Sequence, residues 1–406
     1  MSLDEIEKPE RYCPGGYHPI STGDHLSGRY DVVHKLGFGT YSTTWLAKER
    51  TLEKYVAIKI AVAGADIREG KILNTLAFSQ PDFSEPISRL IPQVLDTFSL
   101  NGPNGKHQCL VTEPGMMSIA EAKDASYSRT FRMAVARAIA AQVIQAVVLL
   151  HHRGVVRADL HPGNIMLHLP HNIDRLSPEQ LYEKYGHPTL EPFERLDGKP
   201  LSHNIPSHGV VPIWLGKDSD LVSLSEAKVF IADFGESFLP CTTQRYYSNT
   251  PAVLAPPEIY FLLNEPLSFP SDIWTLACTL WDILGQRPVF EGFNPSSDWM
   301  IKEHVDSLGK LPSEWWRTWD GRGRWFTEEG KRISEGAGRS LIDRFVDSIQ
   351  EPRRGSTAEI AEDEIRALLA MFRGMLAFQP DERLTAREIM ESEWVQRWAL
   401  PCLEVA

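Results

Sequence analysis

The chain has 406 residues, 42% of them apolar and 24% charged, so it can bury a large hydrophobic core and is not expected to be disordered. Its 42 basic and 54 acidic side chains give a formal net charge of −12, which argues against non-specific binding to nucleic acid and fits a basic partner. Five scattered cysteines without a C-x-x-C pair predict free thiols in a reducing compartment, and the acidic start MSLDEIEKPE and the lack of a long apolar run predict neither a secretory signal nor a membrane span.

Residues 30–62 predict three β-strands, because YDVVHKLGFG, STTWLAKER and YVAIKIAV are rich in β-branched and aromatic residues and are separated by turns. The next segment, IREGKILNTL, has helical spacing at Ile67, Leu73 and Leu76, and HQCLVTE predicts a buried strand. A long helix is expected in FRMAVARAIAAQVIQAVVLLHH, ended by Gly154. These elements indicate a small β-rich lobe followed by a larger helical lobe.

Residues 168–228 differ in character, since they are dense in Pro, His, Gly and charged residues with one short helical candidate at 177–185. Long structureless loops are uncommon inside a domain, so this segment predicts an insertion packed on the surface. An apolar strand, KVFIAD, follows the insertion. Helices are then expected near residues 271–285, 297–308, 338–349, 362–377 and 385–398.

The segment KLGFGTYSTTW places Gly37 and Gly39 between two predicted strands. Glycine lets the backbone approach phosphate oxygens and donate N–H groups to them, although a lone G-x-G is more often a hairpin turn. Lys59 favours the phosphate interpretation over a simple edge-strand lysine, because a lysine in the apolar strand VAIK needs a counter-charge, which Glu69 on the next helix can supply. The candidate nucleotide-binding residues of this loop are Leu36, Gly37, Phe38, Gly39, Thr40, Tyr41, Ser42, Thr43 and Thr44.

The segment VVRADLHPGNIML has Asp159 followed five residues later by Asn164, which is the spacing of a phosphoryl-transfer catalytic loop. In FIADFGESF, Asp233 comes directly after an apolar strand, where its carboxylate is well placed to hold Mg²⁺. Either motif can arise by chance. Their order after G-x-G and V-A-I-K makes a phosphoryl-transfer site the preferred hypothesis.

These motifs together resemble those of eukaryotic protein kinases over about residues 30–398, and the chain is most similar to the SR-protein kinase family. The similarity is carried by the leader YCPGGYHPISTGDHLSGRY, the glycine loop GFGTYSTTWLA, the long spacer after the catalytic loop, and the later segment HVDSLGKLPSEWW. The resemblance implies an α+β, bilobal protein-kinase fold with a small antiparallel-β N-lobe and a larger, mainly helical C-lobe. The implied boundaries are 1–29 for an N-terminal arm, 30–113 for the N-lobe, and 114–406 for the C-lobe including the insertion at about 168–228.

The resemblance also implies ATP and Mg²⁺ as cofactors. Lys59, held by Glu69, would position the phosphates, while the carbonyl of Glu113 and the N–H of Gly115 would face the adenine. Pro114 between them falls at the one position whose N–H is not needed.

Within the C-lobe, the resemblance assigns the catalytic and metal-binding roles. Asp159 would orient the substrate hydroxyl and accept its proton, and His161 would donate a hydrogen bond to the γ-phosphate. Asn164 and Asp233 would be the metal ligands.

Three further C-lobe residues have implied structural roles. Glu258 and Arg383 would form a buried ion pair, and Asp272 would hold the backbone of the catalytic loop.

The catalytic loop departs from the family's pattern at three positions. Arg157 stands where His is usual, Ala158 where Arg is usual, and His161 where Lys is usual. Ala158 removes the usual site for reading a phosphate on the activation loop. In addition, SNTPAVLAPPE matches the pattern T-x-x-Y-x-A-P-E only with a one-residue slip.

The predicted function is therefore an ATP- and Mg²⁺-dependent serine/threonine protein kinase that acts on basic, Arg/Ser-rich proteins. The departures keep open a pseudokinase that binds nucleotide or a partner without turnover. A small-molecule phosphotransferase is the third hypothesis, because DLHPGN recurs in aminoglycoside and choline phosphotransferases. We expect a monomer in the cytoplasm or nucleus that binds a protein substrate, without direct binding to nucleic acid or membrane.

Overall fold

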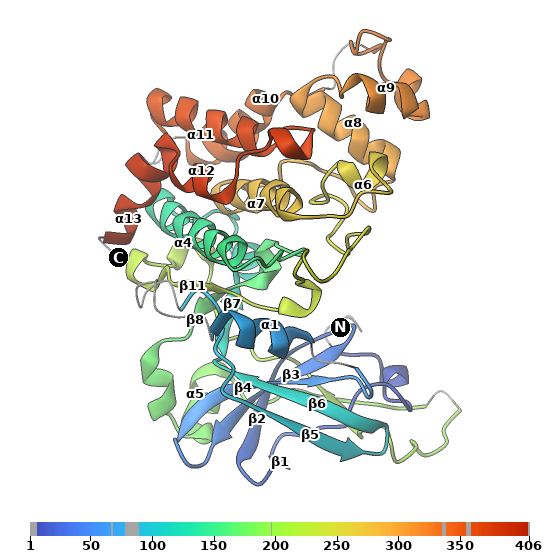
Figure 1. Cartoon of the computed structure of the whole chain (residues 1–406). Coiled ribbons are helices and arrows are strands. Elements are labelled where there is room, and N and C mark those ends of the chain that lie inside the picture. Colours follow the sequence, from blue (N-terminus) through green and yellow to red (C-terminus); the bar gives the residue numbers. More distant parts are fainter. Residues whose placement is uncertain are drawn as a thin grey trace. The chain divides into compact units, whose positions relative to one another are not determined.

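The computed structural model divides the chain into two units (Figure 1). The first unit is rich in strands and the second is mainly helical, so the expected α+β, bilobal fold is confirmed. The first unit comprises Met1–Pro81, Pro92–Met117 and His168–Gly216, and the second comprises Asp82–Ile91, Ser118–Leu167 and Lys217–Ala406. The structure describes residues 6–65, 68–77, 89–195, 197–334, 338–354 and 359–404.

A six-stranded antiparallel sheet, in the order β1-β2-β3-β4-β6-β5, forms the first unit. Strands β2, β3, β4 and β6 confirm four of the five strands expected from the sequence, and the fifth, in KVFIAD, is β11 (Val229–Ile231) of the second unit. Strand β5 was not expected, although its alternating burial and the turn NGPNG before β6 are hairpin signals. The bounds are His25–Leu26 (β1), Tyr30–Gly39 (β2), Ser42–Glu49 (β3), Lys54–Ala61 (β4), Asp96–Gly102 (β5) and Gly105–Thr112 (β6).

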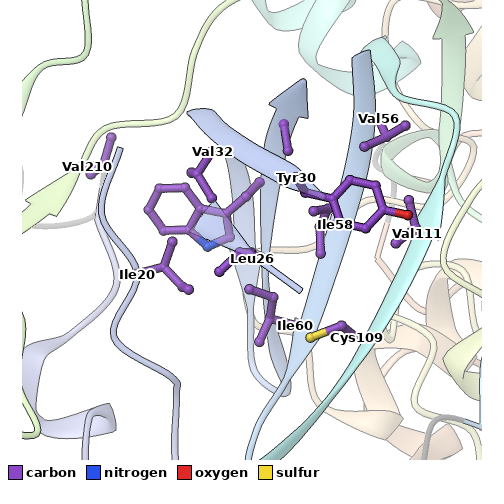
Figure 2. Close-up of a cluster of buried hydrophobic side chains, with 12 residues drawn as sticks. Ile20, Leu26, Tyr30, Val32, Val56, Ile58, Ile60, Cys109, Val111 and Val210 are labelled. Carbon is purple, nitrogen blue, oxygen red and sulfur yellow. The ribbon is translucent and has the colours of Figure 1, made fainter. Parts of the chain in front are cut away.

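Both faces of this sheet carry buried clusters. One strand contributes to both clusters, because its neighbouring residues point to opposite faces. One face carries the core of Figure 2, in which Ile20 of the N-terminal arm and Val210 of the insertion lie beside strand residues such as Val32. The arm and the insertion therefore complete this core. Its buried members are Ile20, Leu26, Tyr30, Val32, Trp45, Ala47, Val56, Ile58, Ile60, Cys109, Val111 and Val210.

The other face of the sheet is covered by the first part of the insertion. Helix α5 (Pro178–Tyr185) confirms the expected helix and begins with a capping box between Ser177 and Gln180. Its Leu181 joins a second buried cluster with strand residues such as Leu46. Strands β9 (Leu190–Pro192) and β10 (His208–Val210) then form a hairpin.

The insertion thus lies in the first unit as far as Gly216. This grouping differs from the expected boundaries, which assign residues 168–228 to the C-lobe. The physical reason is the burial of Leu181 and Val210 against the two faces of the sheet. Helix α1 (Arg68–Ala77) also belongs to this unit and confirms the helix expected after β4, of which Ile67 lies outside the described residues.

Helix α4 (Met133–His152) is central to the second unit and lies against α7 (Phe269–Leu284) (Figure 1). By length and composition, α4 is the one helix among the described residues that could span a membrane. However, 72% of that apolar stretch is buried inside the protein. The sequence analysis expected no apolar run of this length. Packing in the core of the second unit explains why α4 is so apolar.

The remaining elements of the second unit match the expected helices in part. Helices α7, α8 and α11 confirm three of them, whereas the short helices α3, α6, α9 and α13 were not expected. The expected helix at 338–349 begins later, as α10, and continues as a π-helical turn, and the one at 385–398 is broken after α12. The bounds are Ile119–Ala125 (α3), Ile165–His168 (β8), Val229–Ile231 (β11), Glu258–Phe261 (α6), Ser297–Leu308 (α8), Ser313–Thr318 (α9), Leu341–Phe345 (α10), Glu362–Met375 (α11), Ala386–Met390 (α12) and Pro401–Glu404 (α13).

His304 of α8 is completely buried among aromatic side chains of the second unit. Its ring centroid lies 5.0 Å from that of Trp274 and 4.5 Å from that of Phe290. Neither ring nitrogen has a hydrogen-bond partner among the described residues. Desolvation by burial lowers the pKa of His304 to about 3.

We predict that His304→Phe makes the protein less sensitive to acid. Below the ordinary histidine pKa of about 6.5, the unfolded chain binds a proton that folded His304 does not, so the free energy of unfolding falls as pH falls. One such group contributes a slope of at most about 1.4 kcal/mol per pH unit. Urea unfolding of both proteins from pH 7 to pH 5 should show the wild type losing stability faster, and parallel profiles would contradict the assignment.

Candidate active site

The glycine-rich loop is the turn between β2 and β3, where Gly37 pairs with Thr44 and Gly39 with Ser42. Neither glycine has a positive φ, and a Cβ added at either would meet no atom of the described residues within 4 Å. The fold itself therefore does not require glycine at these positions. Glycine is required at such positions where a ligand approaches the backbone closely, and the contact with phosphate expected from the sequence stays a prediction.

Eight of the nine loop candidates are at least partly exposed. Thr43 is the exception, because its side chain is buried and its Oγ1 accepts a hydrogen bond from Trp45 Nε1 at 3.1 Å. A contact between Thr43 and a nucleotide would therefore go through the backbone.

Lys59 and Glu69 form the ion pair expected from the sequence. Lys59 lies on β4 directly opposite Thr44 of the glycine-rich hairpin. Its Nζ donates to Glu69 Oε2 on α1 at 2.6 Å, with 26% of the lysine side chain exposed. Since an ammonium group has three N–H donors, Lys59 can bind a phosphate oxygen while it stays paired with Glu69.

The residues expected to face the adenine come just after β6. Thr112 ends that strand and pairs with Ala57, and Glu113 and Pro114 lead into β7 (Gly115–Ser118). Glu113 is exposed and Gly115 is partly exposed. Their role in binding a base stays a prediction.

Asp272 on α7 fixes the backbone of the catalytic loop, as expected from the sequence. Its Oδ2 accepts the N–H of Arg157 at 2.6 Å and its Oδ1 accepts the N–H of Ala158 at 2.8 Å. Ala158 has a φ of 62°, in the left-handed region that costs a non-glycine residue about 1–3 kcal/mol. Two hydrogen bonds to a buried carboxylate hold the loop in this conformation.

Asp159 and Asn164 are joined by hydrogen bonds within the same loop. Nδ2 of Asn164 donates to the backbone oxygen of Asp159 at 3.1 Å and to its Oδ2 at 3.3 Å. Asp159 Oδ1 is buried and has no hydrogen-bond partner among the described residues. Such an oxygen can accept the proton of a substrate hydroxyl.

Asn164 and Asp233 fit the expected metal site. The N–H of Ala232 donates to the backbone oxygen of Asn164 at 2.7 Å, which brings the two candidate ligands to adjacent positions. Because Nδ2 of Asn164 binds Asp159, its Oδ1 remains the atom that can bind a cation. Asp233 is exposed, with a φ of 55°. Two protein oxygens, supplemented by phosphate oxygens and water, suit Mg²⁺.

His161 is bound within the catalytic loop. Its Nδ1 accepts the N–H of Gly163 at 3.1 Å, and its Nε2 lies 3.7 Å from Asp159 Oδ2. In the neutral ring, an accepting Nδ1 leaves the hydrogen on Nε2, a tautomer inferred from these contacts. His161 is therefore a donor close to the candidate catalytic carboxylate, and its contact with a γ-phosphate stays a prediction.

Arg157 has a role that the sequence analysis missed. Its side chain is completely buried, and its Nη2 donates to the backbone oxygen of Ala232 at 2.8 Å. Its guanidinium lies 5.2 Å from the centroid of the Phe234 ring. Arg157 therefore holds both neighbours of Asp233, and its position two residues before Asp159 is the one signal of this in the sequence.

The segment after Asp233 is held by its own charged side chains, which the sequence analysis also missed. Arg245 Nη1 donates to Glu236 Oε2 at 2.9 Å and to its backbone oxygen at 2.6 Å. Thr250 Oγ1 donates to the backbone oxygen of Ala158 at 2.9 Å. The contacts of Arg245 hold the segment internally, and the bond of Thr250 ties it to the catalytic loop.

Glu258 and Arg383 form the expected buried ion pair, with two hydrogen bonds of 2.8 and 2.6 Å. The guanidinium also donates to three backbone oxygens, those of Pro270, Ala377 and Phe378. The pair joins the first residue of α6 to the segment before α12.

Comparison with known proteins gives matches to protein kinases. Residues 30–176 match the family model described as the protein kinase domain. A serine/threonine protein kinase of Aspergillus fumigatus is 25% identical, over 96% of this chain and 90% of that protein. SRSF protein kinase 3 of Homo sapiens is 34% identical over 170 residues, which are 40% of this chain and 30% of that protein.

A solved structure supports the fold over nearly the whole chain. The crystal structure of a kinase domain matches with a TM-score of 0.62 at 16% sequence identity, and the match covers 93% of this chain and 98% of that one. At this identity the likeness concerns the fold.

We predict that Glu258→Gln destabilises the second unit, because it leaves the buried guanidinium of Arg383 without its counter-charge. Breaking a buried ion pair by removing one partner costs about 3–5 kcal/mol. Urea unfolding followed by circular dichroism measures the effect. The exposed Glu265→Gln is the matched control, and equal stability of the two variants would refute the structural role of the pair.

Proposed function

Because the chain carries a protein kinase domain and resembles the SR-protein kinases, we propose that it is an ATP- and Mg²⁺-dependent serine/threonine protein kinase. One observation carries this proposal most strongly. Asp159 has a buried Oδ1 without a hydrogen-bond partner among the described residues, on a loop whose backbone is fixed by Asp272 and whose Asn164 is bound to the same carboxylate. This is the arrangement that a base for a substrate hydroxyl needs.

In the proposed reaction, a serine or threonine hydroxyl donates a hydrogen bond to Asp159. The hydroxyl oxygen forms a bond to the γ-phosphorus of ATP, the bond from that phosphorus to the β,γ-bridging oxygen breaks, and ADP leaves. Asp159 takes the hydroxyl proton. Lys59, paired with Glu69, holds the phosphates of the substrate nucleotide in position.

Asn164 and Asp233 would hold Mg²⁺, which neutralises charge on the phosphates when bound. The role of Arg157 is to hold the segment around Asp233 through Ala232 and Phe234. The chain thus positions its candidate metal ligand Asp233 with a buried arginine side chain.

The proposed substrate is a basic, serine-containing protein. The relative named SRSF protein kinase 3 and the formal charge of −12 both support this choice. Opposite net charges favour encounter between enzyme and substrate, and salt screens this attraction.

A pseudokinase is the second candidate function, and the position of His161 favours it. A lysine at that position would be a permanent cation, whereas His161 has its Nδ1 occupied by the N–H of Gly163. The loop therefore lacks a fixed positive charge at this point, and transfer would be slow or absent.

The decisive test is transfer of radiolabelled γ-phosphate from ATP to an array of serine peptides with and without arginines. We expect labelling of the arginine-containing peptides and none by Asp159→Asn, because an amide cannot accept the hydroxyl proton. Circular dichroism establishes that the variant is folded. Stabilisation of the protein by nucleotide without any labelling would support the pseudokinase, and labelling of an aminoglycoside or choline would support a small-molecule phosphotransferase.

The role of His161 is tested by two variants that separate its two contacts. His161→Asn keeps an acceptor able to cap the N–H of Gly163, but its shorter amide has no donor at the position of the ring Nε2, whereas His161→Lys keeps a long donor and loses the cap. If His161 acts as a donor to the reacting groups, we expect the Asn variant to lose about tenfold or more in kcat. The Lys variant should stay near the wild-type value. The reverse order would make His161 a loop-capping residue and remove it from the catalytic set.

A further inference from the structure

The N-terminal arm binds the tip of the glycine-rich loop directly. The hydroxyl of Tyr17 donates to the backbone oxygen of Gly39 at 2.6 Å, and the guanidinium of Arg11 donates to the backbone oxygen of Thr40. These are consecutive carbonyls at the turn between β2 and β3. Tyr17 and Arg11 come more than twenty residues earlier in the chain and are not part of the hairpin.

Tyr17 is fixed in place by burial, and the exposed Arg11 lies against its ring. Tyr17 is 3% exposed, and its ring packs edge-on against Tyr12 with centroids 5.6 Å apart. The guanidinium of Arg11 lies 5.3 Å from the centroid of the Tyr17 ring. The turn that brings the two residues together requires Gly16, because a Cβ there would lie 1.9 Å from the backbone oxygen of Arg11.

A third contact anchors the strand that leads into the loop. Lys35 of β2 is completely buried and forms an ion pair with Glu7 of the arm, which is 2% exposed. The Nζ of Lys35 also lies 5.1 Å from the centroid of the Phe38 ring. The arm therefore holds the glycine-rich hairpin at three positions, which are Lys35 before the glycines, Gly39 itself and Thr40 just after it.

The insertion in turn holds the arm. Nδ2 of Asn204 donates to the backbone oxygen of Tyr12 at 2.8 Å. Nδ2 of Asn104 donates to the backbone oxygens of Tyr17 at 2.7 Å and of Asn204 at 3.1 Å, which joins the three segments. A buried apolar cluster of Ile6, Tyr12, Tyr17 and Phe193 covers the junction.

Fixing a carbonyl also fixes the N–H of the next residue, because the peptide group is planar and its N–H is trans to the C=O. The contact at Gly39 therefore sets the direction of the Thr40 N–H, and the contact at Thr40 sets that of the Tyr41 N–H. The carbonyl of Tyr41 is held as well, by the N–H of Val62 at 2.9 Å. The N–H groups of Thr40, Tyr41 and Ser42 are thus oriented by hydrogen bonds to the carbonyl of the residue before each of them.

From this geometry we infer that the N-terminal arm preorganises the glycine-rich loop for nucleotide phosphates, with Tyr17 and Arg11 as positioning residues. The inference rests on the proposed function, since phosphate is the ligand that a row of backbone N–H groups would bind. Preorganised donors lose less conformational freedom on binding, so the arm raises nucleotide affinity without touching the nucleotide. The insertion serves this site by holding the arm.

The test compares two substitutions that remove the same kind of hydrogen bond from the same strand. Tyr17→Phe deletes the bond to Gly39 of β2, and Tyr182→Phe deletes a bond of 2.7 Å from an α5 hydroxyl to the backbone oxygen of Val33, also on β2. Both variants keep the aromatic ring. An effect on general stability would therefore appear in both, whereas an effect on the loop is expected in Tyr17→Phe.

Isothermal titration calorimetry with MgADP gives the first readout. We expect the Kd of Tyr17→Phe to rise about fivefold, the worth of one hydrogen bond, and that of Tyr182→Phe to stay at the wild-type value. Arg11→Ala is an independent variant, and its Kd for MgADP is also expected to rise. Equal Kd values for wild type, Tyr17→Phe and Arg11→Ala would overturn the inference.

Hydrogen exchange without nucleotide gives the second readout. The amides of residues 40–42 should exchange faster in Tyr17→Phe than in the wild type and in Tyr182→Phe. Unchanged exchange would overturn the inference whether or not the protein binds nucleotide. If the amides exchange faster in Tyr17→Phe but the wild-type protein fails to bind MgADP, the arm's effect on the loop stands and the proposed function is rejected.

Discussion

The carboxylate of Asp272 is the constraint on which the candidate active site of the second unit depends. It is completely buried, and two backbone N–H groups of the catalytic loop and Nε2 of His151 surround its oxygens. A buried carboxylate without such partners would cost several kcal/mol, so the loop must adopt the conformation that supplies them. That conformation places Asp159 immediately after a strained Ala158 and directs the side chain of Arg157 to Ala232.

The first unit uses buried charge in a similar way. Lys59 is held by Glu69 of α1, and Lys35 is held by Glu7 of the N-terminal arm. Buried ion pairs add little net stability, because desolvation offsets much of the attraction, but removing either partner is costly. Each pair therefore acts mainly as a geometric restraint that joins a strand of the sheet to a separate segment of the chain.

The sequence predicts those features that local pattern or motif order determines. The strands β2 to β4, the helix α4 and the pairs Lys59–Glu69 and Glu258–Arg383 all follow from periodicity or from the order of the kinase-like motifs. Asp272 was expected for the same reason.

The missed features depend on contacts between distant segments. Nothing near Asn204 in the sequence indicates that its amide binds the carbonyl of Tyr12, and so the sequence does not predict that most of the insertion groups with the first unit. The sequence also does not indicate that Arg157 stacks on Phe234, because the kinase pattern has histidine at this position and predicts no guanidinium contact there. Both misses concern side chains whose partners lie more than seventy residues away.

The assembly of the first unit from three separate stretches of chain has a consequence for biosynthesis. The arm leaves the ribosome before Phe193 and Val210, which help to bury it and the sheet and are translated nearly two hundred residues later. At about 5–20 residues per second, that delay is on the order of 10 s or more. During this interval the nascent sheet carries uncovered apolar side chains while α4, which belongs to the second unit, is already being made. The two units are therefore translated in alternation, and the β-rich unit cannot finish folding before the first part of the helical unit, including α4, has been synthesised.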